Sequence, residues 1–352
     1  MKRIIKNEFQ KFFKSRKNII IIILFFTYVL GMNFYNLKQY NLYMKETAET
    51  YRSRYMQADG IFGQNALRLE KDENLTDKER EELEEEMEFY RVERNKLMLI
   101  SQTYEEDNEE KFYYALIAEN DRYKNILKGL EDEIIEDGFL KEKGLDMEEI
   151  HRKMHINQYM LDNDIQPILN PYTMTGANSL IMFLDGENLL ILIFLIALLS
   201  IDIYLSEIEE GSYKLAYSQP FERKQIFLGK VIVIIIVSLA IIVLGALLNF
   251  IIVSAIYGIG DMNYPFVTRG NIKSLAFSTS DIGYSILPLW EFVLMGFILL
   301  LPILLLTITL IICISIFLDS STKTLGFSIM LLVLSFIFEN FLDKQSIINL
   351  IY

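Results

Sequence analysis

Five long runs of apolar residues, almost free of charge, constrain this chain more than any other feature of its sequence. They cover 18–35, 189–205, 231–257, 292–318 and 325–338. A run of about 18 or more uncharged apolar residues is long enough for a helix to cross a bilayer. The last run needs its flanks to do so. The sequence therefore predicts an all-α polytopic membrane protein with five transmembrane helices.

The charged residues collect between these runs. The net charge is −13, yet the segment 36–187 alone holds 19 basic and 35 acidic residues, so the rest of the chain is slightly basic. Such an acidic segment repels nucleic acid, which we exclude as a partner. Its composition is rich in helix formers. We expect helices over 40–56, 77–104, 109–128 and 147–161, with breaks near Gly60 to Gly63, Gly129, Gly138 and Gly144.

The first 17 residues indicate the orientation of the chain. They contain seven Lys or Arg residues and one Glu, and Ile5, Phe9, Phe12 and Phe13 recur at helical spacing. A basic amphipathic helix of this kind lies in the headgroup layer on the anionic, cytoplasmic face of a lipid membrane. The positive-inside rule then places the N-terminus in the cytoplasm, at the cell (plasma) membrane, and 36–187 on the outside.

The segments follow one another in a simple order. They are an amphipathic helix (1–17), a span (18–35), an acidic helical extracytoplasmic domain (36–187), a span (188–205), a cytoplasmic loop (206–230), a span (231–257), an outer loop (258–291), a span (292–318), an inner turn (319–323), a span (324–341) and an outer tail (342–352). Within the third of these, 166–186 has the composition of a loop that re-enters the membrane. The single cysteine, Cys313, lies inside an apolar run and is a packing residue.

The common catalytic and cofactor motifs are absent from the sequence. It contains no G-x-x-x-x-G-K-[ST] phosphate loop, no H-E-x-x-H, no G-x-S-x-G and no cysteine pair. We therefore expect a protein that is not an enzyme and binds no cofactor itself. His151 and His155 share a helix face with Glu148, which makes them weak candidates for a metal site. Two surface histidines on an acidic helix need no such explanation, and we predict no metal.

One carboxylate falls within the second apolar run. An ionisable residue inside a span is a candidate functional residue. This residue, Asp202, lies about one turn from Glu207 and the cytoplasmic end of the run. Snorkelling toward water is therefore the simpler interpretation of Asp202.

The loop 206–230, SEIEEGSYKLAYSQPFERKQIFLGK, carries the most chemical information. We call it the central loop. It is short, and it connects the second and third spans. We expect an amphipathic turn over 212–218, stopped by a proline, so that a push from the cytoplasm would move both spans. The alternative is an ordinary charged loop. The candidate coupling residues are Glu207, Glu210, Gly211, Tyr213, Pro220, Arg223 and Lys230.

Together with the basic segment KNEFQKFFKSRKNIIIII, the central loop resembles that of ABC type-2 exporter permeases. In that family an "elbow" helix leads into the first span, an acidic-Gly signature follows the second, and a Pro-x-x-Arg step and a Lys precede the third. Ser212 stands where the family usually has Thr. The matching positions are Glu207, Glu210, Gly211, Pro220, Arg223 and Lys230. The resemblance covers the elbow, the first three spans and the span layout, but not 36–187.

The resemblance implies partners and a transport activity. It implies separate cytoplasmic ABC ATPase subunits that hold ATP and Mg²⁺, and a second permease in a homo- or heterodimer. It also implies movement of an amphipathic substrate, such as an antimicrobial or other peptide, a lipid-linked compound or a drug, out of the cytoplasm or membrane.

Some alternatives stay open at this point. The family usually has six spans, so either a sixth is missing from this chain or its C-terminus stays outside. The acidic segment is either a gate or receptor for cationic peptides or a solvated helical domain. The alternative function is a membrane-anchored envelope sensor or scaffold with a helical ectodomain and no transport activity.

Overall fold

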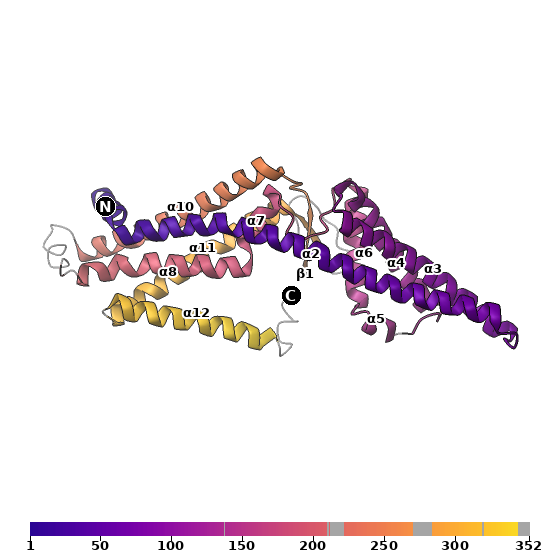
Figure 1. Ribbon diagram of the computed structural model, residues 1–352. Coiled ribbons are helices and arrows are strands. Elements are labelled where there is room, and N and C mark those ends of the chain that lie inside the picture. Colours follow the sequence, from indigo (N-terminus) through magenta and orange to yellow (C-terminus); the bar gives the residue numbers. More distant parts are fainter. Residues whose placement is uncertain (137, 210, 212–221, 270–283, 319, 344–352) are drawn as a thin grey trace. The chain divides into compact units, whose positions relative to one another are not determined.

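The computed structural model describes residues 1–136, 138–209, 211, 222–269, 284–318 and 320–343. The chain divides into two compact units, which we describe separately. The span unit comprises Met1–Phe34, Met174–Gly260 and Trp290–Tyr352, and the inserted unit comprises Tyr35–Thr173 and Asp261–Leu289. Helices dominate both units (Figure 1). The predicted class, an all-α polytopic membrane protein, is confirmed.

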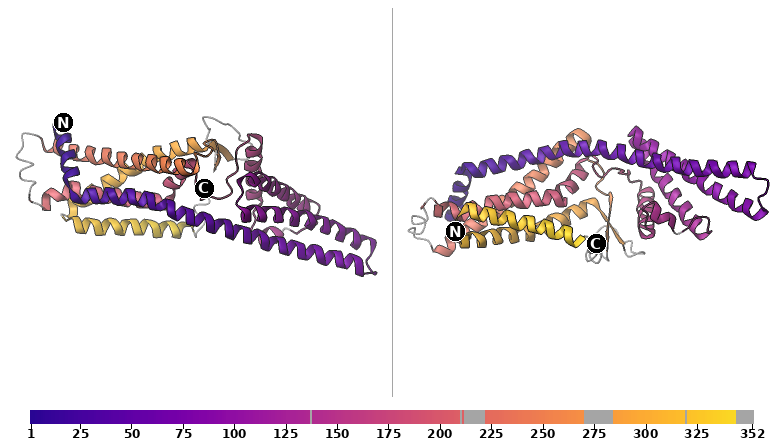
Figure 2. Two further views of the ribbon diagram at one scale, coloured as in Figure 1. Left: turned by 45° about the horizontal axis from the view of Figure 1, so that its top comes forward. Right: turned by 60° about the horizontal axis from the view of Figure 1, so that its bottom comes forward.

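The span unit is a bundle of helices. Figures 1 and 2 show α2, α8 and α10 running alongside one another in this unit. Its helices are α1 (Lys2–Lys14), the first part of α2 (Arg16–Lys71), α7 (Gly176–Leu184), α8 (Gly186–Glu209), α10 (Arg223–Tyr257), α11 (Leu289–Leu318, whose first residue belongs to the inserted unit) and α12 (Ser321–Asp343).

Among the described residues, three helices are long and apolar enough to cross a membrane: α2, α10 and α11. A fourth candidate is α7 together with 188–201 of α8, a pair that is bent by 62°. The fifth predicted span falls in α12, so the total of five stays a prediction. The helices also extend beyond the predicted spans, because a helix ends where its backbone hydrogen bonds end and not where its hydropathy falls.

The predicted helices of the acidic segment are largely confirmed, with one correction. α3 (Asp77–Glu106), α4 (Glu109–Glu131) and α6 (Met147–Asp162) occupy the expected positions. The expected break at Gly60 to Gly63 is wrong, since α2 continues to Lys71. An interior glycine costs a helix only about 1 kcal/mol relative to alanine. The neighbouring side chains of Ile61 and Phe62 pack against a buried cluster that offsets this cost.

The predicted break near Gly129 is displaced, and that near Gly144 is confirmed. α4 runs two residues past Gly129, where a Cβ atom would lie 2.9 Å from a ring carbon of Phe89. Gly138 opens the short helix α5 (Gly138–Glu142). Gly144 follows it with a φ of +62°, a conformation that glycine adopts at little cost.

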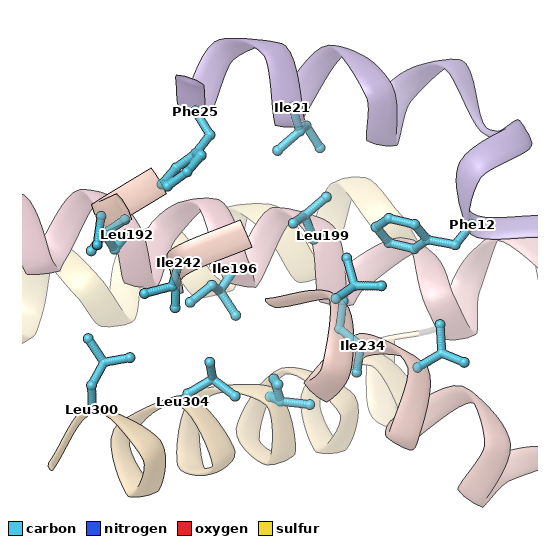
Figure 3. Close-up of a cluster of buried hydrophobic side chains, with 14 of the residues drawn as sticks. Phe12, Ile21, Phe25, Leu192, Ile196, Leu199, Ile234, Ile242, Leu300 and Leu304 are labelled. Carbon is cyan, nitrogen blue, oxygen red and sulfur yellow. The ribbon is translucent and has the colours of Figure 1, made fainter. Parts of the chain in front are cut away.

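The core of the span unit lies between α1, α2, α8, α10 and α11. Figure 3 shows Ile21 and Phe25 of α2 directed toward Leu192, Ile196 and Leu199 of α8, with Phe12, Ile234, Ile242, Leu300 and Leu304 completing the cluster. The apolar stripe of α1 faces this core: Phe12 is buried in the cluster, Ile5 and Phe9 pack against it, and Phe13 is exposed.

Close helix contact in this core depends on small residues. A Cβ atom at Gly245 of α10 would lie 2.6 Å from ring carbons of Phe25 of α2, too close for any other residue without a shift. Lipid tails are as apolar as the side chains, so tight packing drives helix association in a membrane more than water exclusion does. Gly245 therefore sets how near α2 and α10 approach.

The inserted unit is built on α3, which packs antiparallel to α4 (Figure 2). Thr76 and Glu79 form a complete capping box that starts α3, at the residue where the sequence predicts a helix over 77–104. The unit also holds an antiparallel hairpin of β1 (Pro265–Arg269) and β2 (Tyr284–Pro288), in which Pro265 pairs with Pro288. This hairpin was not predicted, because 258–291 reads as a polar loop.

Candidate functional site

The central loop is described at its two ends. α8 ends at Glu209, and Gly211, with a φ of +69°, donates its N–H to the Ile208 carbonyl at 3.1 Å. A glycine in the left-handed conformation is the usual residue just after a helix C-terminus. α10 begins at Arg223. Glu210, Tyr213, Pro220 and the expected turn over 212–218 lie outside the described residues.

Both ends of the central loop carry charges that oppose the dipole of their own helix. Glu207 and Glu209 stand in the last turn of α8, where the structure describes no basic residue. Arg223 and Lys224 stand in the first turn of α10, where no acidic residue is described. Each such placement costs about 0.3–1 kcal/mol of helix stability. Glu222 at the N-cap of α10 has the favourable sign, and Glu209 accepts a hydrogen bond from Ser321, so these costs are partly offset within the chain itself.

The last residues of the central loop hold α1 against α10. Lys230 is buried, and its Nζ lies 3.9 Å from Oε2 of Glu8, whose other oxygen accepts from Lys11 at 3.1 Å. At Gly229 a Cβ atom would lie 2.7 Å from Ile4 Cγ2. The sequence predicted Lys230 as a site residue but missed Glu8 and Gly229. The available signal was Glu8 itself, the only acidic residue in a strongly basic segment.

Glu209 at the other end of the loop contacts α12. Its Oε1 accepts the backbone N–H of Ser321, the first residue of that helix, at 2.7 Å. Glu209 was not among the predicted coupling residues. No local pattern could have indicated this contact, because its two partners are 112 residues apart in sequence.

The short helix α7 is joined to its neighbours at both ends. The N–H groups of Gly176 and Ala177 donate to the carbonyls of Gly258 at 3.0 Å and Ile259 at 2.8 Å. At its other end the Asn188 amide donates to the Met182 carbonyl at 2.5 Å and accepts from Tyr28. Irregular backbone at membrane depth is tolerated only when protein satisfies its polar groups. The composition of 166–186 agrees with this arrangement, whether α7 and α8 form a broken span or a re-entrant loop.

A pair of asparagines connects α2, α7 and α10. Asn33 donates to Oδ1 of Asn249 at 2.8 Å, and Asn249 donates to the Ser179 carbonyl at 3.3 Å. Asn249 is completely buried. Side-chain hydrogen bonds between membrane helices contribute about 0.6–2 kcal/mol each. No sequence pattern distinguishes these two residues from the apolar runs in which they lie.

The remaining predicted site residues are not brought together. Asp202 and Glu207 lie in α8, with side chains outside the described part of the chain. Arg223 is exposed at the start of α10. His151 and His155 lie on α6, and the described residues contain no group of three or more His, Cys, Asp or Glu that could hold a metal ion.

The inserted unit carries a polar groove of about 660 Å³ between α2 and α5. Its lining includes Glu46, Glu49 and Glu142. The two cations in the groove have protein partners: Arg54 donates to the Lys143 carbonyl at 3.2 Å, and Lys143 donates to Gln57 at 2.9 Å. Two of the carboxylates are paired as well, Glu142 with Lys143 at 3.2 Å and Glu49 with Lys45 at 3.9 Å, so the charges of the groove are largely balanced.

Comparison with known proteins assigns the family. No curated protein and no solved structure gives a significant match to this chain. The sequence profile described as ABC-2 family transporter protein matches residues 3–349. This match extends across the acidic segment 36–187, which the motif resemblance did not cover. The chain thus belongs to the ABC-2 transporter family, as a multi-pass membrane permease.

Proposed function

We propose that this chain is the transmembrane permease subunit of an ATP-driven exporter, and that the central loop receives the force of the ATPase. Permeases of this family are non-catalytic membrane subunits that typically work with cytoplasmic ABC ATPases. ATP and Mg²⁺ would then be bound by the separate ATPase subunits. The observation that supports this best is the dense set of charged residues at the two described ends of the loop, on helices that continue into candidate spans.

The ends of the loop suggest how a push would be passed on. Both Glu209 and Arg223 belong to helices that continue directly into candidate spans, so little flexible backbone separates the loop from the membrane. The Lys230–Glu8 pair would carry α1 along with α10. Movement of the loop would thereby reach three helices of the span unit.

Affinity purification of the tagged chain from native membranes in mild detergent tests this function. We expect an ATPase with a phosphate loop to copurify in stoichiometric amounts, with ATP hydrolysis in the eluate. A second permease in the same eluate would identify a heterodimer, and its absence a homodimer. Recovery of the chain without an ATPase, even after trapping with ATP and vanadate, would favour the sensor or scaffold function instead.

We also propose that the substrate is amphipathic and cationic, a peptide of the antimicrobial kind. The supporting feature is charge: the acidic segment 36–187, with 35 acidic against 19 basic residues, attracts cations. A cationic amphipathic peptide is expected to stimulate ATP hydrolysis by the reconstituted complex. A neutral analogue of equal hydrophobicity, a lipid-linked compound and an uncharged drug are the comparisons. Equal stimulation by the neutral analogue would contradict the charge preference.

A further inference from the structure

The contact between Glu209 and α12 stabilises the start of α12. It also gives a partner to a carboxylate that is unfavourably placed at the C-terminal end of α8. A carboxylate at the C-terminal end of α8 meets the negative end of that helix. Its Oε1 instead accepts the N–H of Ser321 at 2.7 Å, at the positive end of α12. The first N–H groups of a helix have no partner within the helix itself, so Glu209 satisfies one of them.

Packing continues along the same face of α8. Ala197, Ile201 and Leu205 recur every four residues and form a buried cluster with Ile311 of α11. Ile208 and Leu325, the latter in the first turns of α12, pack against this cluster. Figure 1 shows α12 lying along α8 within the span unit. The inner half of α8 is thus in contact with α11 and α12 up to the residue where the central loop begins.

We propose that Glu209 is a positioning residue that transmits movement of the central loop to the first turn of α12; this inference rests on the proposed function. A hydrogen bond keeps its strength only over a few tenths of an ångström. When the end of α8 is displaced, Ser321 therefore has to follow or lose its partner. The packing of Ile208 and Leu325 against the same buried cluster holds the two helices together, so α12 follows α8.

Hydrogen exchange of the copurified permease–ATPase complex tests the transmission. The complex is compared without nucleotide and after trapping with ATP and vanadate, and the readout is the peptide that covers 320–326. In the wild type this peptide is expected to change its exchange on trapping. In Glu209→Ala the Ser321 amide should exchange roughly tenfold faster without nucleotide, as for loss of one charge-assisted hydrogen bond. The change on trapping should disappear.

Two further variants separate transmission from folding. Glu209→Gln keeps an acceptor oxygen and should keep most of the response to trapping. Glu82→Ala is the control, because Glu82 is an exposed carboxylate on α3, outside the central loop, and pairs with Lys78. Its response should equal that of the wild type.

The outcomes distinguish failure of the role of Glu209 from failure of the proposed exporter function. If the ATPase copurifies and the 320–326 peptide of Glu209→Ala still responds to trapping as in the wild type, the role of Glu209 is refuted while the exporter function stands. The role is equally refuted if Glu82→Ala loses the response. If no ATPase copurifies with the wild type, the proposed function fails and this inference fails with it.

Discussion

Replacing Arg122 by methionine is expected to destabilise the inserted unit by about 3–5 kcal/mol, the typical cost of leaving one member of a buried ion pair alone. Nε of Arg122 lies 2.6 Å from Oε1 of Glu93, and the two side chains are 1% and 4% exposed. In the described structure the second oxygen of Glu93 is also buried and has no hydrogen-bond partner. The variant would therefore leave a carboxylate without any strong partner in the interior.

The surroundings of this pair add to the expected cost. Next to Arg122 on α4, Glu119 accepts hydrogen bonds from Tyr51 at 3.2 Å, Tyr123 at 3.0 Å and Asn157 at 3.2 Å. Burial, reinforced by the Glu119 carboxylate, raises the pKa of Tyr51 and of Tyr123. Both phenols therefore stay protonated at neutral pH and continue to donate. Polar networks of this kind are stabilising only while each member keeps its partner.

Hydrogen exchange of α3 and α4 peptides in the full-length, detergent-purified chain measures the effect. Because the double variant Arg122→Met with Glu93→Leu removes both charges, it should recover most of the lost protection. Lys78→Met is the matched control: Lys78 pairs with Glu82 on the surface of α3, and its loss should change stability by about 0.5 kcal/mol or less. Equal loss of protection in the single and double variants would contradict the ion-pair explanation.

The features that the sequence predicts correctly depend on residues that are close together in the chain. Apolar runs identify candidate spans, and the Thr76–Glu79 box fixed the start of α3 because capping involves residues three apart. Gly60 and Gly63 led to a wrong prediction because distant residues decide whether the helix breaks there. Their small local cost is overcome by packing of Ile61 and Phe62 against residues that are distant in sequence. A break was expected where only tertiary contacts could show that none occurs.

The candidate site also divides into local features, which the sequence shows, and tertiary contacts, which it does not. The charged signature of the central loop was visible in the sequence, and so was Lys230. Its partner Glu8 and the contact from Glu209 to Ser321 depend on how helices associate. The Asn33–Asn249 pair is still harder to predict, since each asparagine alone is a single polar residue near the end of an apolar run. Single-chain patterns do not indicate which of these residues meet.

Reversing two charges of the central loop, Arg223→Glu with Glu210→Lys, is expected to abolish association of the ATPase while the permease still inserts into the membrane. Arg223 opens α10, where a glutamate is favoured by the helix dipole, and residue 210 directly follows the end of α8, where a lysine is favoured. Each replacement should stabilise its own helix by about 0.3–1 kcal/mol. Loss of association could then not be attributed to unfolding of the permease.

The measurement is the amount of copurified ATPase per permease, together with the thermal stability of each permease in detergent. The matched control exchanges the charges of an exposed pair on the inserted unit, Lys78→Glu with Glu82→Lys, and should leave association unchanged. If the loop variant is at least as stable as the wild type yet retains its ATPase, the charges at the loop ends do not dock the partner. A permease that is at least as stable as the wild type but lacks its ATPase would show that these charges are kept for the partner.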